Sequence, residues 1–310
     1  WLERVPFVSA SYVFALAAAK EAAGEQHYPQ GTLYVVATPI GNLADISLRA
    51  LHVLKLADTV ACEDTRHTQQ MLRAYGIDKS AGQLLAVHQH NEAEAANAVV
   101  DRLRQGQRVA YVSDAGTPGI SDPGARLVAA VQVQGLRALP LPGASSITAL
   151  ISVAGCASDT GGGTGFVFEG FLPTKATERI HAVATLQTEV RAVALLEAPH
   201  RIEATAAALG ALGERKVTVG RELTKQFEEI ATLPAAELAA WFAADTNRLR
   251  GEFALVLHPA PVATEAGQDT RVLQLLLAEL PLKTAVKLAA EITGAPRNAL
   301  YDLALALKKN

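Results

Sequence analysis

Residues 113–124 read Ser-Asp-Ala-Gly-Thr-Pro-Gly-Ile-Ser-Asp-Pro-Gly and come directly after the apolar run Arg108–Val112. Glycine permits positive φ and close backbone approach, and proline fixes φ, so this composition favours a tightly bent loop after a buried strand. In open parallel sheets, ligands bind at the carboxyl ends of strands. We therefore expect the loop to present backbone groups and short polar side chains to a small ligand. An ordinary turn between a strand and a helix is the alternative.

The composition is typical of an α/β protein with well-buried cores. The chain has 310 residues, half of them apolar, which predicts two domains and a small appendage. The net charge of −3 provides no global basic field, so an RNA partner would need a local basic patch. No apolar run is long enough for a transmembrane helix. The two cysteines, Cys62 and Cys156, lack the spacing of zinc ligands and are too few for a disulfide framework, which favours a reducing cytosol.

Strand-like and helix-like segments alternate from Gly31 onward. Near-continuous apolar strands separated by helices predict a parallel sheet that is covered on both faces. The expected strands of this sheet are Thr32–Thr38, Thr59–Cys62, Leu84–His88, Arg108–Val112 and Leu136–Leu141. A glycine-rich break at Asp159–Gly165 precedes a second block, which begins at Phe166 and has the pattern of a mixed sheet.

The organisation that we expect has five parts. Residues 1–30 are interpreted as a poorly ordered extension, because they show neither a basic signal-peptide start nor a match to the rest of the pattern. The remaining parts are an α/β domain (31–144), a second α/β domain (145–260), a linker (261–270) and a helix–turn–helix-like unit (271–310).

Two further loops follow strands of the expected parallel sheet. Residues 37–45 lack the glycine pattern of a dinucleotide-binding loop and the Gly-Lys-Ser/Thr of a phosphate loop. Residues 140–146 contain Pro-Gly followed by two serines, either of which is able to cap the next helix. Capping and ligand contact are compatible, since a helix N-terminus gathers free N–H donors.

Charged and polar clusters also follow strands. Residues 63–68 (Glu-Asp-Thr-Arg-His-Thr) and 88–92 (His-Gln-His-Asn-Glu) come after the second and third strands, which indicates a crevice shared with the 113–124 loop. The alternative for each is a solvated loop with a helix cap. Residues 197–201 and 221–229 mix both charges, and a salt-bridged surface is their alternative.

Ten strings of the chain together resemble the ribosomal RNA small subunit methyltransferase I family, whose members have the tetrapyrrole methylase fold. They run in the family's order from Gly31 to Leu257. The strings are Gly-Thr-Leu-Tyr-Val-Val-Ala-Thr-Pro-Ile-Gly-Asn-Leu, Glu-Asp-Thr-Arg-His-Thr, His-Asn-Glu, Ser-Asp-Ala-Gly-Thr-Pro, Ile-Ser-Asp-Pro-Gly, Leu-Pro-Gly-Ala-Ser, Phe-Glu-Gly-Phe-Leu-Pro, Pro-His-Arg, Arg-Glu-Leu-Thr-Lys and Gly-Glu-Phe. The C-terminal residues resemble the small helical domain of many members, whereas Gly161–Gly163 and the N-terminal extension depart from the pattern.

The resemblance implies an α/β fold with a parallel-sheet N-terminal domain, a mixed-sheet second domain and a small C-terminal helical domain. It implies S-adenosylmethionine as cofactor, bound between the two domains of a cytoplasmic homodimer. The implied cofactor residues are Pro39, Gly41, Asn42, Ser113, Asp114, Ala115, Gly116, Thr117, Ile120, Ser121, Asp122, Pro142, Gly143, Ser145, Ser146 and Ile147. The implied reaction is methylation of a cytidine ribose 2′-hydroxyl in the decoding region of small-subunit ribosomal RNA, within an assembled subunit.

A sulfonium methyl is already electrophilic, so transfer requires alignment and no metal, and a base helps by taking the 2′-hydroxyl proton. The candidate bases are Glu63, Asp64, His67, His88, His90 and Glu92. We favour the Glu63–His67 cluster for alignment and proton removal, with Arg66 on phosphate and with Asn91 and Glu92 orienting the nucleotide. Further candidates for RNA contact are Arg221, Lys225, Lys283, Lys287 and Arg297. The C-terminal unit is expected to add RNA affinity, with dimerisation as the alternative.

Two other functions remain open at this point. One is methylation of a tetrapyrrole by an enzyme of the same fold, and the other is a non-catalytic RNA-binding assembly factor. A nicotinamide dehydrogenase is disfavoured, because the required glycine pattern is missing.

Overall fold

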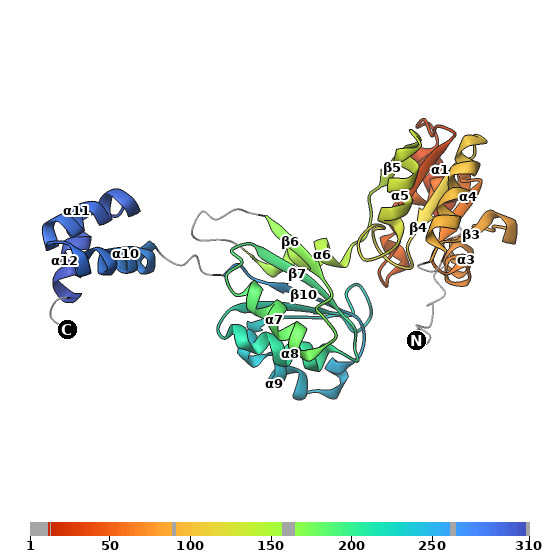
Figure 1. Cartoon of the computed structure of the whole chain (residues 1–310). Coiled ribbons are helices and arrows are strands. Elements are labelled where there is room, and N and C mark those ends of the chain that lie inside the picture. The colour runs from red at the N-terminus through yellow and green to blue at the C-terminus, as the bar shows by residue number, and fades with distance from the viewer. Residues whose placement is uncertain (1–11, 13, 89–90, 157–164, 261–264, 308–310) are drawn as a thin grey trace.

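The computed structural model describes residues 12, 14–88, 91–156, 165–260 and 265–307. These residues form a first domain, a second domain and a C-terminal unit of helices (Figure 1). Short 3₁₀ helices interrupt the loops at Leu43–Asp45, Ala81–Gln83, Gly210–Leu212, Ala235–Glu237 and Thr246–Leu249. Within the described residues, no helix has the length and apolar character needed to cross a membrane.

The first domain contains one sheet in the order β3-β2-β4-β1-β5, in which all neighbours are parallel. Its strands are β1 (Thr32–Val36), β2 (Thr59–Cys62), β3 (Leu84–Ala86), β4 (Val109–Val112) and β5 (Arg137–Leu141). The helices between them are α2 (Leu48–Leu56), α3 (Thr65–Ala74), α4 (Glu92–Arg104) and α5 (Gly124–Val133). The predicted parallel sheet is confirmed, and its central strands are buried on both faces.

The apolar side chains of these strands divide between two cores because successive residues point to opposite faces. Tyr34 and Val36 pack with the residues of α2 and α3, whereas Leu33 and Tyr111 pack with those of α4 and α5. All the strands run in one direction, so their carboxyl ends, and the loops that follow them, share one edge of the sheet.

The second domain has the predicted mixed sheet, whose strands lie in the order β6-β7-β10-β8-β9. β6 and β7 are parallel, and the other neighbours are antiparallel. The strands are β6 (Phe166–Gly170), β7 (Ala192–Glu197), β8 (Lys216–Arg221), β9 (Glu229–Pro234) and β10 (Phe253–Leu257). Helices α7 (Ala176–Leu186), α8 (Ile202–Leu209) and α9 (Leu238–Ala243) contribute to a core on one face. Helix α6 (Ser146–Ala154) follows β5 and packs on the other face, so the chain changes domain between these elements.

The expectation that residues 1–30 are poorly ordered is wrong for residues 14–30. Residues Ala15–Ala23 form helix α1, which packs against α2 and buries Ala19 completely. The Tyr34 hydroxyl then donates a hydrogen bond to the carbonyl oxygen of Pro29 at 2.9 Å, which fastens the segment that leads into β1. An alanine-rich helix has few large apolar residues, yet its small side chains allow close packing. Residues 1–11 and 13 lie outside the described residues.

Helices α10 (Glu265–Glu279), α11 (Leu282–Thr293) and α12 (Arg297–Leu307) form the C-terminal unit. Leu273, Val286 and Leu300 are buried between them. The predicted linker 261–270 is too long, because α10 begins inside it, at Glu265. Residues 265–269 contain no large apolar side chain, so hydrophobic periodicity did not indicate the start of this helix. Residues 261–264 and the glycine-rich break at Gly161–Gly163 lie outside the described residues.

The contact between α1 and α2 can be tested with Ala19→Leu. Because Ala19 is fully buried, the larger side chain is expected to lower the free energy of unfolding by about 1–3 kcal/mol. Ala18→Leu places the same side chain at an exposed position of the same helix and is the matched control. Urea denaturation measures both variants; equal stabilities would contradict the packing of α1 on the first domain.

Candidate functional site

The three predicted ligand loops meet at one edge of the first sheet. Thr38, after β1, and Gly116, after β4, exchange two backbone hydrogen bonds, with N···O distances of 2.9 and 3.0 Å. The Thr117 hydroxyl donates to the carbonyl oxygen of Ala144, after β5, at 2.9 Å. The loops that follow β1, β4 and β5 are therefore bound to one another and form one surface.

Two glycines allow these loops to approach. Gly116 has φ +79°, a left-handed conformation that favours glycine. A Cβ on Gly143 would lie 2.9 Å from the Cβ of Ala37 and 3.3 Å from its carbonyl oxygen, so no side chain fits between the loops after β1 and β5.

Asp122 shapes the 113–124 loop from within. Its carboxylate accepts hydrogen bonds from the backbone N–H groups of Gly119 and Gly124, both at 2.7 Å, and from the Tyr111 hydroxyl at 3.1 Å. Burial, with the neighbouring Asp122 carboxylate, raises the pKa of Tyr111 far above its usual value, so the phenol remains a donor. The adjacent Ser121 has φ +68°. The structure thus gives Asp122 a role in loop shape.

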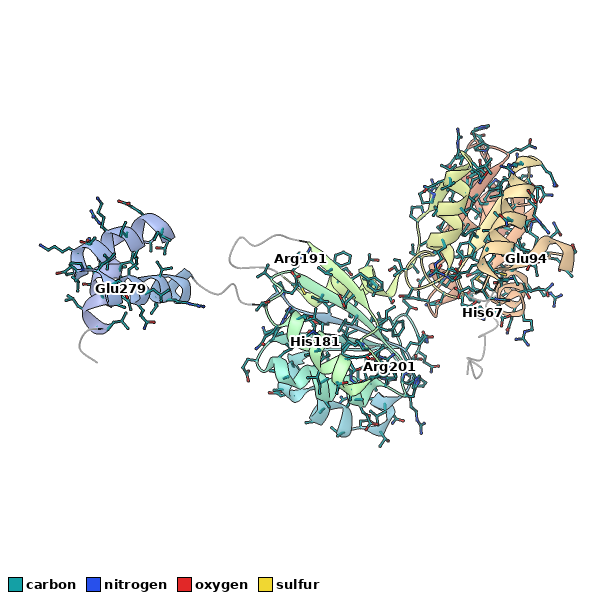
Figure 2. All side chains as sticks on the ribbon, viewed as in Figure 1. His67, Glu94, His181, Arg191, Arg201 and Glu279 are labelled. Atoms are coloured by element: carbon teal, nitrogen blue, oxygen red, sulfur yellow. The ribbon has the colours of Figure 1, made fainter. Side chains whose placement is uncertain are left out.

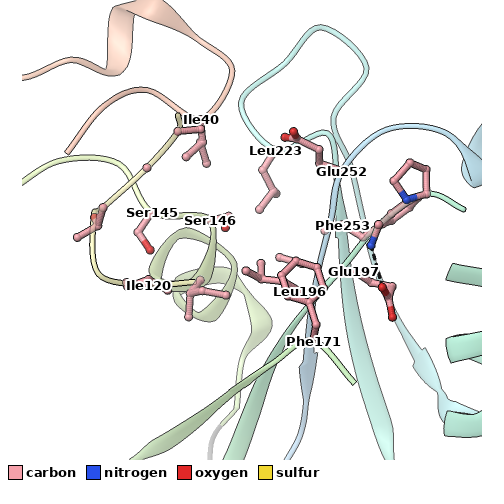
Figure 3. A pocket seen from close by; sticks show the side chains of 18 residues that line it. Ile40, Ile120, Ser145, Ser146, Phe171, Leu196, Glu197, Leu223, Glu252 and Phe253 are labelled. Carbon is pink, nitrogen blue, oxygen red and sulfur yellow. Dashed lines mark hydrogen bonds between the residues drawn. The ribbon is translucent and has the colours of Figure 1, made fainter. Parts of the chain in front are cut away.

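A cavity of about 380 Å³ lies between this surface and the second domain (Figure 3). One wall, built from the loops of the first domain and the start of α6, includes seven of the predicted cofactor residues together with Ile40. Those seven are Ala115, Gly116, Thr117, Ile120, Ser145, Ser146 and Ile147. The other predicted cofactor residues do not line it. They are Pro39, Gly41, Asn42, Ser113, Asp114, Ser121, Asp122, Pro142 and Gly143. Asn42 instead accepts a hydrogen bond from the Ala44 N–H at 3.0 Å, as a cap.

Sequence reasoning did not assign the opposite wall of the cavity. This wall is built from the ends of β6, β7, β8 and β10 in the second domain. Its residues are Phe171, Leu196, Glu197, Ala198, Pro199, Gly220, Leu223, Glu252, Phe253 and Ala254. The strings Phe-Glu-Gly-Phe-Leu-Pro, Pro-His-Arg, Arg-Glu-Leu-Thr-Lys and Gly-Glu-Phe either contain or border most of these positions, so they were the available signal.

Glu197 places a carboxylate in this wall, yet its charge is fully engaged. It is 3% exposed, lies 3.1 Å from the Nε of Arg201, and accepts hydrogen bonds from the Thr205 hydroxyl at 2.5 Å and the Ala198 N–H at 2.9 Å. Arg201, labelled in Figure 2, also donates to the carbonyl oxygen of Leu172. The Glu197–Arg201 ion pair is therefore part of the cavity wall, with a buried carboxylate, whereas Pro199 and His200 of the same string are exposed.

The acidic residues after β2 and β4 hold each other in place. The Asp114 N–H donates to Glu63 at 3.2 Å, and the Asp64 N–H donates to Asp114 at 3.2 Å. Burial raises the pKa of Glu63, although the hydrogen bond from Asp114 opposes the shift. The Asp64 carboxylate accepts from the backbone N–H groups of Arg66 and His67 and caps α3, which lowers its pKa.

The remaining residues of these clusters divide between exposed and engaged groups. The Arg66 side chain is 91% exposed, and its guanidinium lies 3.4 Å from the Asp64 carboxylate. His67, which is labelled in Figure 2, lies on α3. Asn91 closes its loop by accepting from the His88 N–H at 2.8 Å and donating to the Ala86 carbonyl oxygen at 3.0 Å. Glu92 forms an ion pair with Arg126 of α5. His90 lies outside the described residues.

The predicted RNA-contacting cations fall into two environments. Arg221 and Lys225 are largely buried and are paired with carboxylates of their own domain, Glu229 for Arg221 and Glu222 with Glu252 for Lys225. In the C-terminal unit the three predicted cations, Lys283 and Lys287 on α11 and Arg297 on α12, are exposed, as is Arg271 on α10. Across the described ranges, no group of three or more His, Cys, Asp or Glu side chains is placed to hold a metal ion.

The sequence and the fold both match those of known protein families. Residues 32–239 match the family model for Tetrapyrrole (Corrin/Porphyrin) Methylases, and residues 263–308 match the RsmI C-terminal HTH domain. Two solved structures share the fold. That of a cobalt precorrin-4 methyltransferase is 18% identical, with a TM-score of 0.54 over 75% of this chain and 98% of that chain. That of diphthine synthase is 14% identical, with a TM-score of 0.55 over 73% of this chain and 90% of that chain.

Similarity in sequence is much higher to proteins named ribosomal RNA small subunit methyltransferase I. The protein from Pseudomonas aeruginosa is 48% identical, over 89% of this chain and 97% of its own length. Those from Neisseria meningitidis serogroup A (48%, 90% and 94%) and Escherichia coli O157:H7 (45%, 89% and 95%) are comparable. The chain therefore belongs to the ribosomal RNA small subunit methyltransferase I family and carries its tetrapyrrole methylase fold.

Proposed function

We propose that this chain transfers a methyl group from S-adenosylmethionine to the ribose 2′-hydroxyl of a cytidine in small-subunit ribosomal RNA. The observation that carries the proposal is the cavity between the two domains, bounded by the three joined loops, in a chain that is 48% identical to a member of the methyltransferase family. The exposed cations of the C-terminal unit support an RNA substrate over a small tetrapyrrole.

The cavity fits a cofactor with both apolar and polar parts. A volume of about 380 Å³ lies within the usual range of small-molecule sites, about 300–1,000 Å³. Leu196, Leu223 and Ile120 offer apolar contact, and the backbone of 115–117 offers hydrogen bonds. Ser145 stands at the N-terminus of α6 without making a side-chain cap. Its hydroxyl and the free N–H groups of the first helical turn would thus hold polar atoms of the cofactor.

When bound, the cofactor supplies an electrophilic methyl group. The chain's own residues must then orient the ribose and accept its proton. Asp64, Asn91 and Glu92 are engaged in a cap, a loop closure and an ion pair, respectively. Among the described residues, the Glu63 carboxylate accepts one hydrogen bond, from the Asp114 N–H, so it retains acceptor capacity. Asp114 is next to the cavity-lining residues 115–117. We therefore assign proton acceptance to Glu63 and phosphate contact to the exposed Arg66.

The proposal extends to partners and setting. We take the assembled small subunit, rather than naked RNA, as the substrate, and a cytoplasmic homodimer as the working form. The test is methyl transfer from labelled S-adenosylmethionine to small subunits from cells that lack this protein, with naked ribosomal RNA and a porphyrinogen in parallel. Label on a ribose 2′-oxygen of the subunit supports the proposal. Label on the porphyrinogen alone would favour a tetrapyrrole methyltransferase, and absence of cofactor binding would favour an assembly factor.

Gly143→Ala tests the assignment of the cavity to the cofactor. The added methyl would force apart the loops after β1 and β5, so the dissociation constant for S-adenosylmethionine should rise about tenfold, equivalent to about 1.4 kcal/mol. Gly82→Ala, where a Cβ meets no atom within 4 Å, is the control. Calorimetry measures both; unchanged affinity in the Gly143 variant would place the cofactor elsewhere.

The pH dependence of kcat/KM tests Glu63. A base acts only when deprotonated, and burial raises the pKa of Glu63. Activity should therefore fall with decreasing pH from a point above the ordinary glutamate pKa of about 4.3. Glu63→Gln should lower kcat by about 100-fold or more and remove this acidic limb. Glu94→Gln, an exposed position on α4 (Figure 2), is the control. An unaltered profile in Glu63→Gln would exclude Glu63 as the base.

The salt dependence of subunit binding tests the C-terminal unit. Replacing Lys283, Lys287 and Arg297 together by Gln should weaken binding and make the slope of log K against log salt shallower by about 2 to 3. Gln at the exposed residues Lys20 and Lys175 controls for general charge loss. Sedimentation of the triple variant distinguishes the alternative: a monomer with an unchanged slope would assign the unit to dimerisation.

A further inference from the structure

The loop between β8 and β9, residues 222–228, reaches from the second domain to the first and touches it at Gly41. A Cβ on Gly41 would lie only 2.4 Å from Lys225 Cγ, 2.9 Å from Lys225 Cε and 3.1 Å from Thr224 Oγ1. The aliphatic stem of Lys225 therefore rests directly on the glycine backbone, without room for a methyl group. Gly41 lies next to Ile40, which lines the cavity.

The charge of Lys225 is already balanced inside its own domain. Its Nζ lies 2.8 Å from Glu222 and 3.1 Å from Glu252, and the side chain is 15% exposed. Burial by itself lowers the pKa of Lys225, but the two carboxylates outweigh this effect and raise it. An ammonium group held in this way is poorly placed to contact an RNA phosphate, the role that the sequence suggested.

The backbone of the same loop adopts unusual conformations. Glu222 has φ +51° and Thr224 has φ +68°, both in the left-handed region that non-glycine residues rarely occupy. Such strain persists only where the surroundings impose it, and it concentrates at functional sites. Here Glu222 is fastened to the start of β10 by two hydrogen bonds with Glu252, at 2.9 and 3.0 Å. Thr224 Oγ1 is buried and faces Gly41, and no hydrogen-bond partner for it lies within the described part of the chain.

The ion pairs of Lys225 connect its own loop to the segment before β10, and its stem contacts Gly41, next to Ile40, in the first domain. Leu223 of the loop and Glu252 before β10 line the second-domain side, and Ile40 lines the first-domain side. Figure 3 shows Leu223 and Glu252 on one side of the cavity and Ile40 across from them. The separation of the two domains at this end depends on how the Lys225 stem seats against Gly41.

We propose that Lys225 is a positioning residue: its paired ammonium group fixes the 222–228 loop, and its stem packs that loop against Gly41, which sets the width of the cofactor cleft. The inference rests on the proposed function for its consequence, cofactor affinity. The mechanical part, that the contact holds the two domains together, is independent of any ligand.

Two variants probe the two halves of the contact. Lys225→Met keeps an apolar stem and removes the charge. Gly41→Ala keeps the charge but places a methyl group where the Lys225 stem packs against the glycine. Lys175→Met is the matched control, because Lys175 also pairs with a glutamate three residues away, Glu178, but its side chain is 78% exposed. Glu252→Gln removes only one of the two ion pairs and serves if Lys225→Met does not fold.

The first measurement is the distance between the domains in cofactor-free protein. Spin labels on Gln132→Cys of α5 and Glu203→Cys of α8, both exposed, report this distance in a Cys156→Ser background. Lys225→Met and Gly41→Ala should broaden the distance distribution, and Lys175→Met should not. An unchanged distribution in both test variants would overturn the proposal even if the wild-type protein bound no S-adenosylmethionine.

The second measurement is affinity. Calorimetry should show a dissociation constant for S-adenosylmethionine raised about tenfold in Lys225→Met and in Gly41→Ala, while the salt dependence of small-subunit binding stays unchanged. If Lys225→Met instead keeps the cofactor affinity and makes the salt slope shallower by about one, Lys225 is a phosphate contact and the proposal is wrong. If the wild-type protein does not bind S-adenosylmethionine, the proposed function fails, and the distance measurement still decides the proposal.

Discussion

The two backbone hydrogen bonds between Thr38 and Gly116 are the constraint on which the rest of the site depends. They join the loops after β1 and β4, which are neighbours in the parallel sheet but lie far apart in the sequence. The bridge requires the left-handed conformation of Gly116, and the third loop can reach it only because Gly143 leaves space beside Ala37. The three loops therefore form one continuous surface, and the second domain forms the opposite wall of the cavity.

Much of this arrangement could be predicted from the sequence, for physical reasons. Apolar strands between helices indicated the parallel sheet, and the carboxyl ends of parallel strands share one edge. Loops rich in glycine and proline at that edge marked the first wall of the cavity. The wall in the second domain was missed, because Leu196 and Leu223 look like ordinary strand ends. Only the strand order β7-β10-β8 brings them together. Likewise, α1 was missed because alanines carry little hydrophobic signal yet pack closely.

Charged residues were the hardest to interpret from the sequence, because the same side chain can either bind a ligand or stabilise the fold. Asp64 caps a helix, Asp122 shapes its loop, and Glu197 is held by Arg201 and Thr205 within the cavity wall. A helix cap for residues 63–68 and ion pairing within 197–201 were alternatives from the sequence, but spacing alone did not decide between these roles and ligand contact. In the cluster after β2, the Asp64 carboxylate is thus used as a helix cap, and the roles of Glu63 and Arg66 in chemistry and substrate contact are those that we propose. The structure therefore narrows the candidates by showing which charges are already engaged.

The central claim is that one cleft, built from both domains, holds the cofactor. Hydrogen–deuterium exchange with and without S-adenosylmethionine tests it most directly. The account predicts simultaneous protection of residues 37–42, 113–122 and 142–147, in the joined loops and the start of α6, and of residues 196–199 and 252–254 in the opposite wall. Protection confined to one domain, or protection at neither wall of the cavity when the cofactor is bound, would contradict it.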